Sequence, residues 1–125
     1  MALWFVMCDK TRAPKLSALA EAMPKPKDAE VEVDDDRLVV TLKGCEVRID
    51  METGDDVERA CRKISDEEGA GRNDRAKISM CTARFLIEYE ASEAPTVYNI
   101  LMHAASTIEE LSGGVTWDVD NSRWV

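Results

Sequence analysis

Residues 94–111 read APTVYNILMHAASTIEEL, the longest uninterrupted helical pattern in the chain. Its apolar residues recur at intervals of three and four, which places them on one face of a 3.6-residue helix. Ile100 and Met102 widen this face, so we expect the helix to pack against a sheet. The residues that form the face are Val97, Leu101, Ala104, Ala105, Ile108 and Leu111.

The chain marks both ends of this helix. Ser92 and Glu93 come just before Pro95, whose missing N–H costs nothing in the first turn of a helix. Gly113 and Gly114 follow the pattern and can leave the helix through a left-handed conformation. The sequence therefore predicts a packing helix, which backs a sheet and carries no chemistry of its own.

The other segments alternate between strand and helix patterns. An apolar run at residues 3–8 predicts a strand that is buried on both faces and central in its sheet. Period-two alternation over residues 29–51 predicts three strands of an antiparallel meander. The other predicted elements are helices at 14–23 and about 55–66, a mobile loop at 67–75, a long strand at 77–90, a short strand at 115–119 and a further pairing at 123–125.

The predicted order of elements is βαβββαβαβ, and residues 1–125 contain no internal repeat or domain linker. Helices packed mainly on one face of a mixed, largely antiparallel sheet are the economical arrangement for such an order. We therefore predict one α+β domain.

Two features of the sequence bear on the compartment. The opening MALWFVMCDK has only about seven apolar residues and no basic segment before them, which is too short for a secretory signal or a membrane span. Cys8, Cys45, Cys61 and Cys81 stand among apolar neighbours, which favours buried free thiols in a reducing cytosol. The sequence predicts a cytoplasmic protein without a membrane partner.

The acidic residues are concentrated in the middle of the chain. The net charge is −9, and residues 28–68 hold 15 Asp and Glu against 6 Lys and Arg. Such a surface repels phosphate backbones, so we expect no direct binding of nucleic acid through it. It would attract a protein partner with a basic surface and speed the encounter. A surface that serves only solubility is the alternative.

We expect the partner-binding residues to lie on the solvent side of the acidic strands and in the turn that joins the first two. The candidates are Glu30, Glu32, Asp34, Asp35, Asp36, Asp50 and Glu52.

Signatures of catalysis and of metal binding are weak. Nothing in the sequence nominates a nucleophile for the single histidine, His103, so we lean against an enzyme. The cysteines form no C-x-x-C pair and His103 has no second histidine, so the usual zinc spacings are absent. The run Asp34-Asp35-Asp36 fits a hairpin turn better than a metal site. We predict no cofactor and no metal.

The end of the chain carries one resemblance. The long helix is followed by Gly113-Gly114-Val115-Thr116-Trp117-Asp118 and a closing Arg123-Trp124. This order resembles the finish of many small bacterial α+β proteins, some of which are immunity proteins that neutralise polymorphic or secreted toxins. The likeness covers about thirty residues and transfers no functional residue. It implies an inhibitor that works by binding another protein.

Two classes of function follow from these observations. The first is a non-catalytic, immunity-type protein whose acidic strands occlude the basic surface of a toxin or effector. The second is a small-ligand-binding or enzymatic domain with a pocket between the sheet and the long helix, lined by Tyr89, Tyr98, His103 and Trp117. A self-associating protein that forms a homodimer through its Met-rich and Trp-bearing ends is a third alternative.

Overall fold

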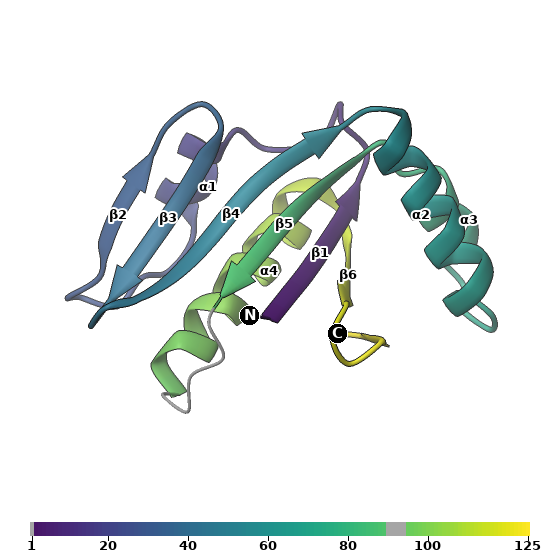
Figure 1. Cartoon of the computed structure of the whole chain (residues 1–125). Helices are drawn as coiled ribbons and strands as arrows, with labels where there is room; N and C mark the ends of the chain where they lie inside the picture. The colour runs from purple at the N-terminus through teal and green to yellow at the C-terminus, as the bar shows by residue number, and fades with distance from the viewer. Residues whose placement is uncertain (1, 90–94) are drawn as a thin grey trace.

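A computed structural model describes residues 2–89 and 95–125 of the 125-residue chain. The described strands form one antiparallel sheet in the order β2-β3-β4-β5-β1-β6-β7 (Figure 1). The α+β class is confirmed. The strands are β1 (Ala2–Cys8), β2 (Glu30–Val33), β3 (Arg37–Leu42), β4 (Cys45–Thr53), β5 (Ala83–Tyr89), β6 (Val115–Asp118) and β7 (Arg123–Trp124). The helices are α1 (Leu16–Ala22), α2 (Asp55–Glu68), α3 (Arg75–Ser79) and α4 (Pro95–Ser112).

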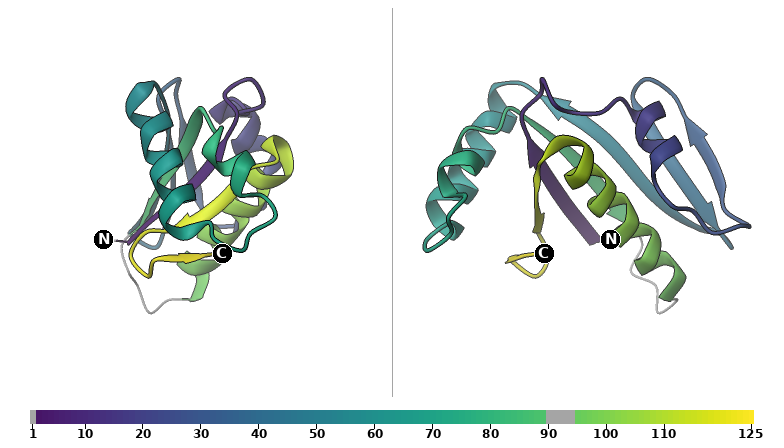
Figure 2. Two further views of the ribbon diagram at one scale, coloured as in Figure 1. Left: turned by 90° about the vertical axis from the view of Figure 1, so that its right-hand side faces the viewer. Right: turned by 180° about the vertical axis from the view of Figure 1, so that it is seen from behind.

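The helices divide between the two faces of the sheet. α1 and α4 cover one face, where the larger core contains Trp4, Phe85 and Leu101 (Figure 2). α2 and α3 pack on the opposite face, where Met7 and Trp117 belong to a second core. We expected helices mainly on one face, and the placement of α2 and α3 differs from that expectation. Because β1 is apolar on both sides, its second side also needs a cover.

The long helix α4 carries its apolar face as predicted, with one exception. Its predicted face residues from Val97 to Ile108 are at most 3 % exposed, but Leu111 is 44 % exposed. At this end of the helix Ser112 takes the inward position, and its hydroxyl donates a 2.6 Å hydrogen bond to the carbonyl of Ile108. Gly113 then leaves the helix with φ +71°, as the glycine pair predicts.

Our prediction for the segment before β5 is wrong. We expected a mobile loop at 67–75 and a strand from Lys77, whereas α2 extends to Glu68 and Arg75–Ser79 forms the short helix α3. Arg75 explains the difference, because its guanidinium donates hydrogen bonds to the carbonyls of Ser65 and Asp66 at the end of α2. The Ser65 carbonyl also accepts from the Gly69 N–H, and both carbonyls lie in the last turn of α2. Contacts between this turn and Arg75 therefore favour a helical turn where the local pattern favours a strand.

The C-terminal tail contacts the connection between α2 and α3. Trp124 packs edge-on against Trp117 with ring centroids 4.7 Å apart, and its indole N–H donates to the carbonyl of Glu68. The Arg72 guanidinium lies 4.2 Å from the centre of the Trp124 ring. The predicted pairing at 123–125 is therefore present as β7, and it helps to order the 69–74 connection.

Some predicted boundaries lie outside the described residues. These are Glu90, the end of the predicted strand, and Ser92, Glu93 and Ala94 before the long helix.

None of the helices in the described part of the chain combines the length and the apolar character needed to cross a membrane.

Leu101 and Leu111 offer a matched test of the α4 packing. We expect Leu101→Ala to lower the free energy of unfolding by about 2–5 kcal/mol, because it empties a fully buried site between α4 and the sheet. Leu111→Ala should lower it by less than about 1 kcal/mol, since that side chain is 44 % exposed. Urea denaturation followed by circular dichroism measures both. Equal losses would contradict this placement of the helix.

Candidate functional site

Within residues 2–89 and 95–125, no helix covers one side of β2, β3, β4 and β5. In Figure 1 this side faces the reader, with α1 and α4 behind the sheet and α2 and α3 to one side. We call it the open face. Strand residues alternate between the two sides of a sheet, so the polar members of each strand lie here and the apolar members lie in the core. The polar residues of the predicted site on β2 and β4 all belong to this face.

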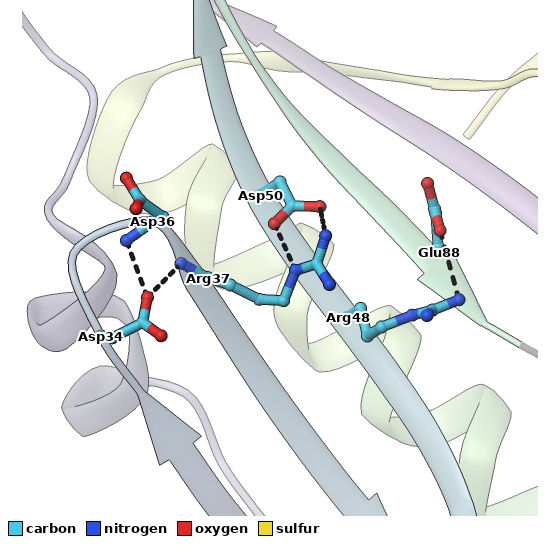
Figure 3. Close-up of polar contacts among 6 residues, drawn as sticks. All are labelled: Asp34, Asp36, Arg37, Arg48, Asp50 and Glu88. Atoms are coloured by element: carbon cyan, nitrogen blue, oxygen red, sulfur yellow. Dashed lines mark hydrogen bonds and ion pairs between the residues drawn. The ribbon is translucent and has the colours of Figure 1, made fainter.

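The strand register places arginines directly opposite carboxylates on the open face. Arg37 pairs with Asp50 across β3 and β4, and Arg48 pairs with Glu88 across β4 and β5. The Arg37 guanidinium binds both Asp50 oxygens, at 2.8 and 3.2 Å (Figure 3). Arg48 Nη2 lies 3.3 Å from Glu88 Oε2. The centre of the open face is therefore a set of neutralised pairs.

A third pair extends this pattern toward β1. Arg84 Nε lies 3.5 Å from Glu52 Oε1, and the Arg84 guanidinium also lies 4.4 Å from the centre of the Phe5 ring. Partly exposed ion pairs of this kind contribute only about 0–1 kcal/mol each to stability. Their larger effect is on the potential of the face, because each arginine cancels one carboxylate. Asp50 and Glu52 therefore do not act as free negative charges.

The acidic residues of β2 differ from those of β4. Glu30 and Glu32 are exposed, and within residues 2–89 and 95–125 no ion pair joins either of them to a cation. Glu46, opposite Thr41 on β3, is exposed in the same way. The uncompensated charge of the open face therefore lies along β2 and, beyond β3, at Glu46 on β4.

The turn between β2 and β3 adds three exposed carboxylates. Asp34 Oδ1 accepts 2.8 Å hydrogen bonds from the backbone N–H groups of Asp36 and Arg37 (Figure 3). These bonds hold the pKa of the Asp34 carboxyl below its ordinary value. Asp35 and Asp36 are both exposed to solvent. The hairpin turn that we predicted is present.

Among the described residues, no group of three or more His, Cys, Asp or Glu side chains is placed to hold a metal ion. This includes the aspartate turn.

The structure thus separates the predicted partner-binding residues into two groups. Asp50 and Glu52 are ion-paired on the open face, and Asp34 also serves as an acceptor within its turn. The exposed acidic group, which we call the β2 acidic edge, consists of Glu30, Glu32, Asp34, Asp35 and Asp36.

A depression of about 380 Å³ lies where β2 runs into its turn. Its apolar lining includes Val33 and Met51, which are 43 % and 42 % exposed, and Leu16 at the start of α1. Asp34 and Asp35 stand at the same depression. Lys15 and Ser17 also line this depression, so a partly apolar depression and the acidic edge adjoin.

The four residues proposed to line a ligand pocket under α4 are not brought together. Trp117 belongs to the core on the α2 and α3 side, whereas Tyr89 packs against the core on the α4 side. Tyr98 is 47 % exposed and packs edge-on against Trp4, and His103 is exposed beside Pro24, Pro26 and Asn99. The described structure offers no support for the pocket.

The four cysteines are free, and three of them are buried as predicted; Cys45 is half-buried. Burial raises the pKa of the Cys61 thiol to about 11 and that of the Cys81 thiol to about 12. Burial also raises the pKa of the Cys8 thiol. Because the thiolate is the reactive form, these three side chains are poor nucleophiles at neutral pH.

Neither a family model, nor a curated protein, nor a solved structure matches the chain.

Sequence reasoning missed the pairing partners and the pocket. Arg48 and Glu88 each stand in phase with the polar residues of their own strand, so their face was readable from period-two alternation. Which of them lie opposite each other depends on register, which the sequence does not display. Val33 and Met51 line one depression together with residues of the β2–β3 turn and of α1, and this arrangement is not visible in the sequence.

Asp34 gives a pH-dependent test of the turn. We expect a carbon-detected NMR titration to give a carboxyl pKa below the ordinary value of an aspartate, because two backbone N–H groups bind its ionised form. The pKa is lower in the folded chain than in the unfolded chain. The hydrogen bonds of the ionised Asp34 carboxylate therefore contribute to stability above the unfolded pKa, and this contribution is lost as the pH falls through the folded pKa.

The stability difference between the parent protein and Asp34→Ala should accordingly shrink as the pH falls through the folded pKa. Urea denaturation at a series of acidic pH values measures it. A difference that stays constant across that range would contradict the assigned hydrogen bonds.

Thiol reactivity tests the burial of the cysteines. We expect Ellman's reagent to modify Cys45 first in the native protein, because the other three thiols are buried. Cys45→Ser should remove this early phase, and all remaining thiols should react once the chain is unfolded in guanidinium. An early phase that survives in Cys45→Ser would show that a buried thiol is accessible.

Proposed function

We propose that this protein is a non-catalytic, cytoplasmic binding protein of the immunity type, which neutralises a toxin or effector by covering a basic surface with its β2 acidic edge. The observation that carries the proposal is the position of uncompensated charge. On the open face the central carboxylates are matched by arginines, but the carboxylates of β2 and its turn are exposed and form no ion pair in the described part of the chain.

Charge in this position suits the recognition of a basic protein. An exposed row of one sign at the end of a sheet attracts the opposite sign over several ångströms and orients the encounter. Binding would depend on salt, because the contributing groups are exposed to solvent and screened by ions. A phosphate backbone would be repelled, so a nucleic-acid ligand is not favoured.

Other features agree with a binding role in a reducing compartment. The cysteines are free, and the buried thiols have raised pKa values that do not favour catalysis. The C-terminal likeness to small bacterial immunity proteins supports the same class of function. No described geometry favours the small-ligand alternative.

The test is a matched pair of charge reversals. Glu30→Lys with Glu32→Lys changes the acidic edge, and Glu67→Lys with Glu68→Lys makes the same change in net charge on exposed positions of α2. The products of the genes next to this one are purified and titrated with each protein by calorimetry at low and physiological salt. We expect one basic, growth-inhibiting product to bind, and the β2 reversal to weaken binding by about tenfold or more.

Co-expression gives the functional readout. The parent protein and the α2 reversal should restore growth in the presence of the toxin, and the β2 reversal should not. Equal weakening by both reversals would indicate a nonspecific effect of net charge. Full protection by the β2 reversal would contradict the proposed surface.

A further inference from the structure

We infer that the outer edge of β2 binds its partner by strand addition, and that the segment it accepts is an extended peptide in which basic and apolar residues alternate. This inference rests on the proposed function and specifies how the acidic edge would be used. Three observations carry it: the open backbone of β2, the different character of its two sides, and the partly apolar depression at its end.

The backbone of β2 is free on its outer side. β2 is the first strand of the sheet and pairs only with β3 among the described residues, and nothing lies beyond it in Figure 1. The Asp34 N–H donates to the carbonyl of Arg37, which makes that opposite pair a hydrogen-bonded one. Hydrogen-bonded and non-bonded pairs alternate in an antiparallel ladder, so the N–H and C=O groups of Val31 and Val33 face outward.

The two sides of β2 demand different side chains from an added strand. Glu30 and Glu32 lie on the open face, and Val31 and Val33 lie on the side covered by α1. A neighbouring strand places its own alternate residues beside these two rows. Lysine or arginine suits the glutamate row, and an aliphatic residue suits the valine row. The ligand is expected to alternate basic and aliphatic residues because β2 alternates glutamate and valine.

The depression at the end of β2 provides a place for one apolar side chain. It begins at Val33 and continues to Met51 and Leu16, with a volume of about 380 Å³. Strand addition gains affinity from backbone hydrogen bonds and specificity from pockets for alternate side chains, which is the arrangement found here.

A second copy of this chain is a poor occupant of the same edge. If two copies paired their β2 strands about a two-fold axis perpendicular to the sheet, the side chains of the same face would align. Glu30 and Glu32 of one copy would then stand opposite those of the other. Like charges directly opposite each other in a sheet are destabilising. The glutamates therefore oppose self-pairing and favour a basic strand.

Two peptides of equal composition test the inference on the intact protein. Ac-Lys-Val-Lys-Val-Lys-Val-NH₂ alternates, and Ac-Lys-Lys-Lys-Val-Val-Val-NH₂ does not. Titration at low salt is followed by two-dimensional NMR of the backbone amides. We expect the alternating peptide to shift the amides of Val31 and Val33 most, and to bind about tenfold more tightly than the block peptide.

Two variants at one position remove or keep the outward N–H. Val31→Pro deletes the donor on the free side of an edge strand, where proline is tolerated, and Val31→Thr keeps both the donor and the β-branched shape. Val31→Pro should bind the alternating peptide about tenfold more weakly, with Val31→Thr close to the parent. The comparison of peptides on the parent protein stays valid even if Val31→Pro folds poorly.

The outcomes separate this inference from the proposed function. If both peptides bind equally and Val31→Pro matches Val31→Thr, the acidic edge attracts basic chains without strand addition, and only the inference is overturned. If neither peptide moves a β2 amide, strand addition is overturned, and the proposed function is judged by the charge-reversal experiment alone.

Discussion

The apolar character of β1 on both of its sides constrains the whole molecule. Trp4, Val6 and Cys8 enter the larger core, and Met7 enters the smaller one. A strand buried on both sides must lie inside the sheet and must be covered twice. β1 lies inside the sheet because it pairs with both β5 and β6. The helices α1 and α4 cover one side of the sheet there, and α2 and α3 cover the other. The position of α2 and α3 is therefore a consequence of β1.

That placement leaves the other end of the sheet uncovered on one side. Since α2 and α3 lie on the β1 and β6 end, no described helix covers the open face of β2 to β5 (Figures 1 and 2). An uncovered face in water must be polar, and one made only of carboxylates would repel itself. Arg37, Arg48 and Arg84 prevent this by standing opposite acidic residues. Among the described strand residues of the open face, the carboxylates without an ion pair are then Glu46 on β4 and the two glutamates of β2, the strand that has a neighbour on one side only.

The sequence was sufficient for those features that depend on local period. The alternation of residues 29–51 predicts which side chains face solvent, and the apolar stripe of the long helix predicts its buried face except at Leu111. Features that depend on contacts between distant segments were not predictable in this way. Arg75–Ser79 becomes helical because Arg75 reaches the end of α2, and Asp50 loses its free charge because the register brings Arg37 to it. In both cases a partner 9 to 13 residues away, outside the range of the local period, decides the outcome.

The same reasoning explains why the candidate site moves from the face of the sheet to its edge. Regional net charge locates acidic residues along the chain, but an ion pair removes a carboxylate from recognition without changing the count of acidic residues. Asp50 and Glu52 are removed in this way, and Glu30 and Glu32 are not. The residues that keep their charge also border unpaired backbone groups at Val31 and Val33. On the face of a sheet, such carboxylates would only promote solubility. At the edge they lie beside unpaired backbone N–H and C=O groups, which can bind an attracted peptide in an extended conformation.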